Sequence, residues 1–563
     1  MSKDSSSQVV TMIENAYLAM QLGRADEVSK IYKRLTINSY GDPTFANIFA
    51  QIALQNNLIA EGIFWLRRSL EVNPDQSAIL LNLGTAFSEI NQIDDALDCF
   101  CKTIKLDANN PLAYFNQGLM YRHLNQLDKA LNSYKNALKI NPNYADALNG
   151  IGRIFHLNEQ FDQAIDYYNE AIQLHPNYSE VIYNKAITLQ ELKRYDEALA
   201  SYDRAIQLKP DYHEPYNGKG NALQELKRYD EALASYDRAI QLKPDDANGY
   251  WNKSLLKLLI GEYEEGWKLY EWRRQHKETK NNYKVYDQPL WLGEKSLQNK
   301  TLLVESEQGL GDAIQFCRYI PMLENIGIKV ILEVPKTLTS IIKTLPGNFL
   351  TFEKGQLPPD FDYHIPIMSL PLAFKTTINK IPASIPYLFS DKTKRRYWKK
   401  KLSKKTKLRI GLVWSGSTTH KNDKNRSLLL KDLEPILHLP FEFHSLQKEV
   451  RENDKTTLFK FKQVHKHQDK LNDFSDTAAL IEEMDLIISV DTSVAHLAGA
   501  MGKDVWILLP FNPDYRWMLE KNNTLWYPTA ILFRQNELNN WNNVIKNVFN
   551  RLLNLNKDTN NGI

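Results

Sequence analysis

The chain has 563 residues, and its 70 basic and 67 acidic residues leave a net charge of +3. This length is too great for one hydrophobic core, so at least two domains are expected. The balanced charge provides no general attraction to nucleic acid or to an anionic membrane surface. We therefore expect no nucleic acid partner, and we look for partners at local sites.

The start of the chain, its apolar runs and its cysteines predict the cellular compartment of the protein. The start, MSKDSSSQVV, contains no apolar signal region, and no apolar run approaches the roughly 20 residues of a membrane helix. Cys99, Cys101 and Cys317 fit no metal motif and suit no disulfide bridge. These features predict a cytoplasmic protein without a transmembrane segment.

The first half of the chain repeats with a period of 34 residues. One position of the period holds proline, or once alanine: Pro74, Ala108, Pro142, Pro176, Pro210 and Pro244. A second position holds small residues, namely Gly84, Gly118, Gly152, Ala186 and Gly220, and a third holds Phe100, Tyr134, Tyr168, Tyr202 and Tyr236. This period is typical of stacked helix pairs. The pattern resembles the tetratricopeptide repeat, and it predicts seven repeats and a partial eighth over 8–276, beginning at 9–42.

Asparagines recur on the first helix of the predicted repeats, which is expected to line the concave face. Asn82, Asn116, Asn184 and Asn252 share one position, and Asn47, Asn149 and Asn217 lie one place earlier. An amide side chain both donates and accepts hydrogen bonds, so such a ladder could hold the backbone of an extended peptide. The alternative is that these amides only solvate the groove.

The pattern changes after about residue 276. Residues 277–299 are polar and irregular, which predicts a linker, and 301–305 then form a short apolar strand. A glycine turn, SEQGLGD at 306–312, precedes an amphipathic helix. Ile314 stands where a dinucleotide fingerprint needs its third glycine, and the chain has no Walker sequence. The turn should place Asp312 at the mouth of a parallel sheet, where α/β folds bind ligands.

A second unit of the same kind follows the basic run 392–407, which we interpret as a helix or linker in preference to a nucleic-acid patch. The apolar strand 408–414 leads into Ser415-Gly-Ser417. The strand 486–490 leads into Asp491-Thr492 and a helix of small residues. Because a helix N-terminus presents unpaired N–H groups and a positive dipole end, this start predicts an anion site, with phosphate as the guest.

Two stretches carry a resemblance to a known family. GLGDAIQFCRYIP (309–321) and SVDTSVAHLAGAMGK (489–503) resemble hallmark stretches of the heptosyltransferase-like family, glycosyltransferase family 9. The flanking segments 420–427, 445–449, 473–481 and 526–535 resemble bacterial proteins that fuse tetratricopeptide repeats to such a domain. The layout is also similar to that of the protein O-linked N-acetylglucosamine transferases.

The resemblance implies a fold class and a set of boundaries. The implied fold is an α-solenoid followed by an α/β GT-B pair, in which two Rossmann-like lobes face each other across a cleft. The acceptor-side lobe is expected at 300–407 and the nucleotide-sugar lobe at 408–556.

The resemblance also implies roles for individual residues. Asp312 is expected to be the base that deprotonates the acceptor hydroxyl, with a helix cap as the alternative. The nucleotide-sugar set is Gly309, Gly311, Ser415, Ser417, Lys424, Arg426, Gln447, Asp491, Thr492, Ser493, Val494 and His496. Within it, the N–H groups of 492–494 would hold the diphosphate, Gln447 would reach the nucleoside, and His496 would orient the loop. Lys424 and Arg426 either neutralise the leaving diphosphate or are solvated loop charges.

Other polar groups are candidates for acceptor or metal binding. His364 is an expected acceptor-side group. Asp360 and Asp362 form a D-x-D pattern, which we do not interpret as a metal site because it lies in a segment resembling the first lobe of the family. His465 and His467 lie in a lysine-rich stretch without a third ligand at useful spacing, and we expect them to be solvated.

The sequence thus predicts an inverting, metal-independent glycosyltransferase. It would move a sugar from a nucleotide-diphosphate sugar, its co-substrate, to a protein or peptide acceptor held by the repeats, with no other cofactor. Two alternatives stay open. The acceptor is a lipopolysaccharide or another surface glycan, or the chain is a non-catalytic scaffold with a nucleotide-binding GT-B domain.

Overall fold

The computed structural model describes residues 43–277, 279–402, 404–519 and 521–561, together with isolated positions before residue 43. The predicted repeat at 9–42 lies almost wholly outside the described residues. The chain divides into two compact units, residues 1–226 and 227–563. Each unit is described by itself.

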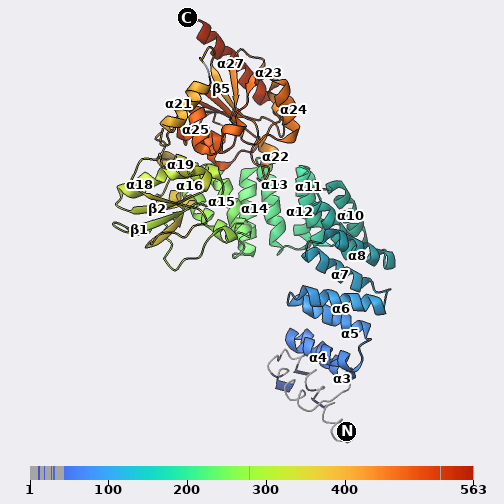
Figure 1. Cartoon of the computed structure of the whole chain (residues 1–563). Coiled ribbons are helices and arrows are strands. Elements are labelled where there is room, and N and C mark those ends of the chain that lie inside the picture. Colours follow the sequence, from blue (N-terminus) through green and yellow to red (C-terminus); the bar gives the residue numbers. More distant parts are fainter. Residues whose placement is uncertain are drawn as a thin grey trace. The chain divides into compact units, whose positions relative to one another are not determined.

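The first unit is a series of antiparallel helices, each packed on the next (Figure 1). The described helices are α3 (Pro43–Gln55), α4 (Ile59–Val72), α5 (Ser77–Glu89), α6 (Ile93–Leu106), α7 (Pro111–His123), α8 (Leu127–Ile140), α9 (Ala145–Leu157), α10 (Phe161–Leu174), α11 (Ser179–Glu191), α12 (Tyr195–Leu208) and α13 (His213–Glu225). Their bounds recur with the period seen in the sequence.

The small and aromatic positions of the repeat contact each other inside each helix pair. A Cβ atom placed on Gly84 would lie 2.6 Å from the ring of Phe100, and one placed on Gly152 would lie 2.5 Å from the ring of Tyr168. Both rings are buried. Real Cβ atoms do not approach this closely, so glycine at these two positions avoids a clash with the ring of the second helix.

The turn inside each repeat is closed by one residue in the left-handed conformation. In the first unit these residues are Asn57, Asn91, Asn125, Glu159 and Lys193, with φ between 56° and 60°. In the second unit Lys227 and Gly261 continue the spacing. Asparagine tolerates this conformation better than glutamate or lysine, because its short side chain bonds locally.

The second unit begins with α14 (Tyr229–Leu242), α15 (Ala247–Leu259) and α16 (Tyr263–Tyr270) and continues into two parallel sheets. The first sheet has the order β3-β2-β1-β4, with β1 at Thr301–Glu305, β2 at Lys329–Val334, β3 at Leu350–Glu353 and β4 at Tyr363–Pro366. The short helices α17 (Leu310–Phe316), α18 (Ile320–Asn325), α19 (Thr339–Ile342) and α20 (Leu370–Ala373) connect or follow its strands.

The segment 277–299 is not only a linker. Leu290 forms a parallel bridge with His364 of β4, and the N–H of Trp291 donates to the carbonyl of His364 at 2.9 Å. Trp291 is buried. The segment therefore extends the edge of the first sheet, although its polar composition predicted an irregular connection.

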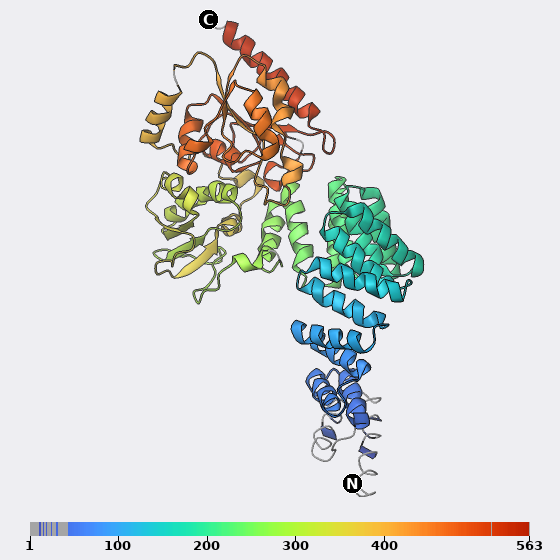
Figure 2. The same ribbon diagram turned by 45° about the vertical axis from the view of Figure 1, so that its right-hand side comes forward.

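The second sheet has the order β10-β9-β8-β5-β6-β7. Its strands are β5 (Arg409–Val413), β6 (Glu442–Ser445), β7 (Val464–His465), β8 (Leu486–Val490), β9 (Val505–Leu509) and β10 (Ala530–Arg534). The helices of this region are α21 (Lys392–Lys401), α22 (Asp423–Arg426), α23 (Glu434–Leu437), α24 (Glu452–Lys460), α25 (Phe474–Glu482), α26 (Ser493–Ala500) and α27 (Asn542–Asn561). The long helix α27 runs beside the sheet and packs on α23 and β10 (Figure 2).

The basic run is a helix held by acidic partners. Lys394 of α21 lies 2.9 Å from Asp473 and 2.8 Å from Asp476 at the start of α25, and Trp398 is buried. The helix interpretation of this run is therefore the one that the structure shows. The boundary predicted at 407 assigned the run to the first lobe. In the structure α21 packs against α25, a helix that immediately precedes β8 of the second sheet.

Candidate functional site

The two stretches with a family resemblance meet in the structure. The first begins α17 directly after β1, and the second begins α26 directly after β8. A Cβ atom on Gly311 would lie 2.9 Å from the His496 ring and 3.6 Å from Cα of Ser493. Gly311 thus lets the first turns of α17 and α26 pack closely. Helix starts that follow strands of two different sheets form one site.

Asp312 lies at the centre of this meeting point. Its Oδ2 accepts the N–H of Gly309 at 2.7 Å, which caps α17, and its Oδ1 is ion-paired with Arg516. The side chain is 15% exposed. Burial raises the pKa of Asp312, and the Arg516 charge opposes this rise. The cap that the sequence left as an alternative is present, and the role of base stays a prediction.

Sequence reasoning missed Arg516, which lies in the turn after β9. Its Nε donates to Oε1 of Gln315 at 2.8 Å, and Nη1 donates to Oδ1 of Asp514 at 2.7 Å. The guanidinium is buried and holds carboxylates from both sheet regions, Asp312 from the first and Asp514 from the second. The only sequence signal was the D-x-R spacing of 514–516, which is too short to single out a site.

Asp491 is a second buried carboxyl group at the site. Burial raises its pKa to about 6, and the neighbouring Asp514 charge adds to the rise. The Nη1 atom of Arg426 donates to the backbone carbonyl of Asp491 at 2.9 Å. An ionised Asp491 is therefore disfavoured by its surroundings, and groups with such shifts gather at functional sites.

Two buried polar atoms in the segment that follows β5 lack a hydrogen-bond partner in the described part of the chain. They are Nε of Arg426 and Oγ of Ser415. Gly416 lies between them, and a Cβ atom there would be 2.8 Å from the Arg426 guanidinium. Buried donors are normally satisfied, so an acceptor such as a phosphate oxygen would suit this place.

The start of α26 is open on one side. Thr492 is the N-cap, but its side chain does not cap the helix, and its hydroxyl lies 3.2 Å from Oγ of Ser489. Ser493 and Val494 are partly exposed. The predicted diphosphate contact with these N–H groups is compatible with this geometry and stays a prediction.

Other members of the predicted nucleotide-sugar set have structural contacts. The Oε1 atom of Gln447 accepts from the N–H groups of Trp414 and Ser415 at 3.3 Å each, and its Nε2 donates to the carbonyl of Ser415 at 2.9 Å. Gln447 is thus buried and holds the loop after β5 instead of facing a nucleoside. Ser417 bonds to Thr419 at 2.8 Å, and Lys424 is exposed.

The His496 ring is held by two aromatic neighbours, and its expected role in orienting the loop stays a prediction. Its Nδ1 lies 3.0 Å from the hydroxyl of Tyr527, and its ring stacks on Trp517 with centroids 5.2 Å apart. Burial lowers the pKa of His496 well below its ordinary value. The ring is therefore neutral near pH 7 and serves as a packing group between the two helix starts.

The predicted acceptor-side residues are not all accessible. His364 is buried in β4, with Nδ1 2.7 Å from Oε1 of Glu305. Asn149 is buried, and its Oδ1 accepts from Nδ2 of Asn184 at 3.0 Å. Asn82 is exposed, and the remaining members, Asn116, Asn217 and Asn252, are partly exposed. The ladder is therefore interrupted, because the side chains of Asn149 and Asn184 are hydrogen-bonded to each other.

The expectation for the two downstream histidines is half wrong. His465 is exposed, but His467 is buried, with Nε2 3.1 Å from Nδ1 of His444. In the D-x-D pattern, Oδ2 of Asp362 accepts the N–H of Thr301 at 2.8 Å, and Oδ1 lies 3.2 Å from Lys300. Asp362 thus fixes the start of β1.

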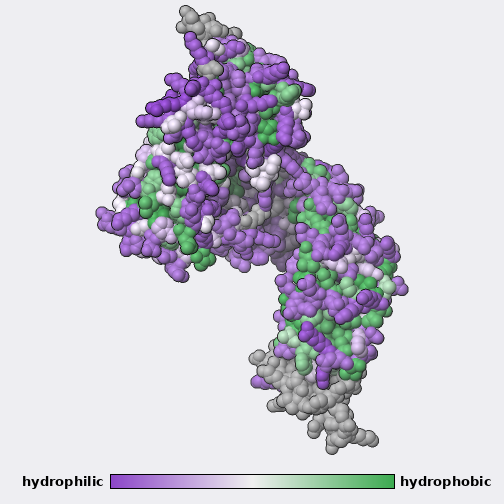
Figure 3. Space-filling view, in the orientation of Figure 1, coloured by the Kyte–Doolittle hydropathy of each residue, from purple (hydrophilic) through white to green (hydrophobic). Residues whose placement is uncertain are grey.

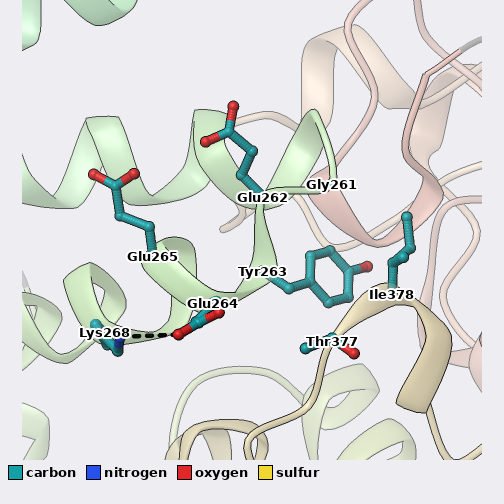
Figure 4. Close-up of a pocket in the computed structure, with 8 residues that line it drawn as sticks. All are labelled: Gly261, Glu262, Tyr263, Glu264, Glu265, Lys268, Thr377 and Ile378. Atoms are coloured by element: carbon teal, nitrogen blue, oxygen red, sulfur yellow. Dashed lines mark hydrogen bonds and ion pairs between the residues drawn. The ribbon is translucent and has the colours of Figure 1, made fainter.

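A separate hollow of about 480 Å³ lies at the start of α16. Figure 4 shows it between Gly261–Glu265 and Thr377–Ile378, with Glu262, Glu264 and Glu265 around it. These glutamates are ion-paired with lysines, so the hollow has no excess of positive charge to hold a diphosphate. We therefore place the candidate site at the meeting of α17 and α26.

Comparison with known proteins identifies the N-terminal region. A family model described as "Tetratricopeptide repeat" matches residues 145–178, 179–212 and 213–246, and another with the same description matches 81–131. A model described as "TPR repeat" matches 118–159. The N-terminal region is a tetratricopeptide-repeat solenoid. The predicted repeats are confirmed over 81–246.

One curated relative is Protein FlbA of Caulobacter vibrioides, 22% identical over 317 residues. The match covers 49% of this chain, and the chain spans only about half, 52%, of the length of FlbA.

Among solved structures, YrrB, described as a TPR protein with an unusual peptide-binding site, is 23% identical. The match covers 34% of this chain and 98% of YrrB, with a TM-score of 0.29. A tetratricopeptide-repeat protein from Parabacteroides merdae is 19% identical, and the match covers 41% of this chain and 91% of that protein, with a TM-score of 0.36.

The helices and the surface of the repeats bear on membrane and protein binding. No helix in the described ranges has both the length and the apolar character needed to cross a membrane. The visible face of the repeats carries hydrophobic patches between hydrophilic ones (Figure 3). Repeats of this kind suggest a protein-interaction scaffold.

Proposed function

We propose that the C-terminal unit is an inverting GT-B glycosyltransferase that uses a nucleotide-diphosphate sugar, and that the repeats bind its protein acceptor. The observation that carries this proposal is the meeting of α17 and α26 around Asp312. Asp312, a carboxyl group with a raised pKa, follows Gly311, which packs against the start of α26. The Arg516 guanidinium is ion-paired with Asp312, and the Arg426 guanidinium donates to the backbone carbonyl of Asp491 just before α26.

In the proposed reaction Asp312 accepts the proton of the acceptor hydroxyl as its oxygen attacks the anomeric carbon. The bond between that carbon and the diphosphate breaks, and the diphosphate leaves with its electrons. A raised pKa favours proton acceptance near neutral pH. Arg426, with its unsatisfied Nε, and the start of α26 would stabilise the leaving charge.

In the proposed mechanism, the ion pair between Arg516 and Asp312 is present before the substrate binds. While Arg516 holds Oδ1, the base is less available. A diphosphate bound beside Arg426 would compete for the Arg516 guanidinium and free the carboxylate. Substrate binding would thus activate the base.

The same ion pair favours a second candidate function, a non-catalytic scaffold that binds nucleotide. In that case Asp312 serves only as a cap and as the partner of Arg516. The repeats would then account for the biological role through protein binding alone.

A thermal-shift screen of nucleoside diphosphates and their sugars tests the proposal. Binding at 100 times Kd stabilises a protein by about 2.7 kcal/mol, which raises the unfolding temperature by several degrees. We expect one nucleotide class to give such a shift and Arg426→Gln to abolish it. Arg396→Gln, on the exposed side of α21, is the matched control and should leave the shift unchanged. The absence of any shift with the wild type, or equal shifts for both variants, would contradict the proposal.

A further inference from the structure

A second cluster of chemically active side chains lies at the edge of the second sheet. β6 and β7 are parallel, with His444 opposite His465, so both side chains project from the same face. Glu442 precedes His444 by two residues in β6 and shares that face. One donor atom from each of the three residues lies within 4.8 Å of the others.

The distances in this cluster approach those of a metal site. Nε2 of His444 is 3.1 Å from Oε1 of Glu442, and Nε2 of His465 is 3.9 Å from the same oxygen. Ligand atoms about 2.0–2.2 Å from a tetrahedral Zn²⁺ ion lie roughly 3.3–3.5 Å apart. Only small side-chain movements are needed to reach this spacing. His465, 51% exposed, is able to make them.

His444 provides the second observation. Its side chain is fully buried, yet its Nε2 has no hydrogen-bond partner in the described part of the chain. The 3.1 Å approach to Glu442 does not satisfy the geometry of a hydrogen bond. A buried ring nitrogen without a partner is unusual, and here it faces a carboxylate oxygen and a second imidazole.

The other ring nitrogen of His444 is held as in known metal sites. Its Nδ1 lies 3.1 Å from Nε2 of His467, which is itself buried. When Nδ1–H donates to His467, the lone pair of Nε2 points towards the cluster. Imidazoles that bind a metal usually donate their other N–H to an acceptor, most often a carboxylate, a carbonyl or water, and here the Nε2 atom of His467 takes that place and would fix the tautomer.

Arg409 is the opposing feature. Its Nε lies 3.2 Å from Oε2 of Glu442, and its positive charge weakens the attraction of the cluster for a cation. The same contact fixes the carboxylate, so Oε1 faces the histidines. The expected affinity is therefore moderate.

We propose that Glu442, His444 and His465 bind one first-row divalent cation such as Zn²⁺, with His467 orienting His444 and with water at the fourth position. Imidazole and carboxylate groups suit such ions. The cluster lies on β6 and β7 at one edge of the second sheet, whereas Ser415 and Asp491 lie in the loops that follow β5 and β8. The cation would link β6 to the two-residue strand β7 and takes no part in the proposed sugar transfer.

Cobalt titration of the untagged full-length chain tests this site, because Co²⁺ in a tetrahedral site gives a visible absorption band that unbound Co²⁺ lacks. After chelator treatment and desalting, we expect one Co²⁺ per chain, displaced by Zn²⁺. His465→Ala should weaken binding at least tenfold, since an exposed ligand is lost while the core is intact. His438→Ala, at an exposed histidine of the same sheet region, is the matched control and should bind as the wild type does.

Glu442→Gln keeps the shape of the side chain and should also weaken binding. Circular dichroism of each variant checks that it is folded. The proposal is overturned if no stoichiometric binding occurs, or if folded His465→Ala and Glu442→Gln both bind Co²⁺ like the wild type. Because the readout is metal binding, the result is independent of glycosyltransferase activity.

Discussion

Two carboxyl groups, Asp312 and Asp491, are kept mostly out of water at the meeting of α17 and α26, and each lies near a guanidinium. Burying a charge costs free energy unless partners offset the loss of hydration. At Asp491 the offset is incomplete, because the neighbouring Asp514 charge also disfavours ionisation. Groups held in this way are common at functional sites.

This cost predicts a pH-dependent effect of Asp491→Asn. Between the ordinary pKa of 3.8 and about 6, the folded chain retains a proton that the unfolded chain has lost. The contribution of Asp491 to the free energy of unfolding therefore falls as the pH rises through this window. Two pKa units correspond to about 3 kcal/mol at most. We expect Asp491→Asn to be more stable than the wild type at pH 7 and equal to it near pH 4.

Urea unfolding at both pH values measures this difference. Asp504→Asn, at an exposed position before β9, is the control and should show no such change. A destabilised Asp491→Asn at pH 7 would show that the carboxylate is held ionised by its partners, against our account.

Individual residues of the candidate site could be predicted from the sequence only where they lie within a motif. Asp312 and Asp491 follow strands in recognisable stretches, so both could be predicted. Arg516 joins Asp312 across 204 positions of the chain, and His444 completes a cluster with His465 through strand register. Such pairs depend on the folding of separate elements, and no local spacing reveals them.

The repeat turns belong to the scale of the element. Glu159 adopts φ 58° between α9 and α10, where other repeats place asparagine, lysine or glycine. A left-handed residue with a Cβ costs about 1–2 kcal/mol, and glycine costs roughly 0.5–1 kcal/mol through chain entropy. We expect Glu159→Gly to stabilise the repeats by about 0.5–1 kcal/mol in denaturant unfolding.

The same substitution within a helix should have the opposite sign. Glu170 is exposed in α10, and Glu170→Gly should destabilise by about 1 kcal/mol. If Glu159→Gly is destabilised as much as Glu170→Gly, strain in the turn is not significant.

Periodicity explains why the helices of the repeats could be predicted well. Each repeat presents the same small, aromatic and turn positions, so an error in one unit is corrected by its neighbours. The strands of the second unit lack this redundancy. β7 has two residues, and the pairing of Leu290 with β4 arises from tertiary contact inside a polar segment. Neither has a sequence pattern of its own.

At the scale of the whole molecule, the proposed function assigns acceptor binding to the repeats and sugar transfer to the C-terminal unit. Deletion of residues 1–178 should leave residues 227–563 folded, since they form a compact unit. Hydrolysis of the donor sugar should survive, whereas transfer to a protein acceptor should fall sharply, because the surface carrying Asn82 and Asn116 is lost. If the truncated chain glycosylates its natural acceptor as well as the full-length chain does, the repeats do not bind the acceptor, and a glycan acceptor becomes the better account.

The two parallel sheets were expected from the alternation of apolar strands and helices, and the structure contains both. The GT-B assignment rests on the resemblance of two stretches and on the site between them. Catalysis therefore has to be established by turnover, because parallel sheets of this kind support many activities.

The most direct measurement is the release of nucleoside diphosphate from the donor sugar identified in the binding screen, compared between the wild type and Asp312→Asn. Loss of a general base should lower the rate by about 10²–10⁴-fold while nucleotide affinity stays within a few fold. Asp360→Asn, at an exposed position near the first sheet, should retain full turnover. If Asp312→Asn releases nucleoside diphosphate at more than about a tenth of the wild-type rate, or if the wild type has no turnover with any donor that it binds, the central claim is wrong.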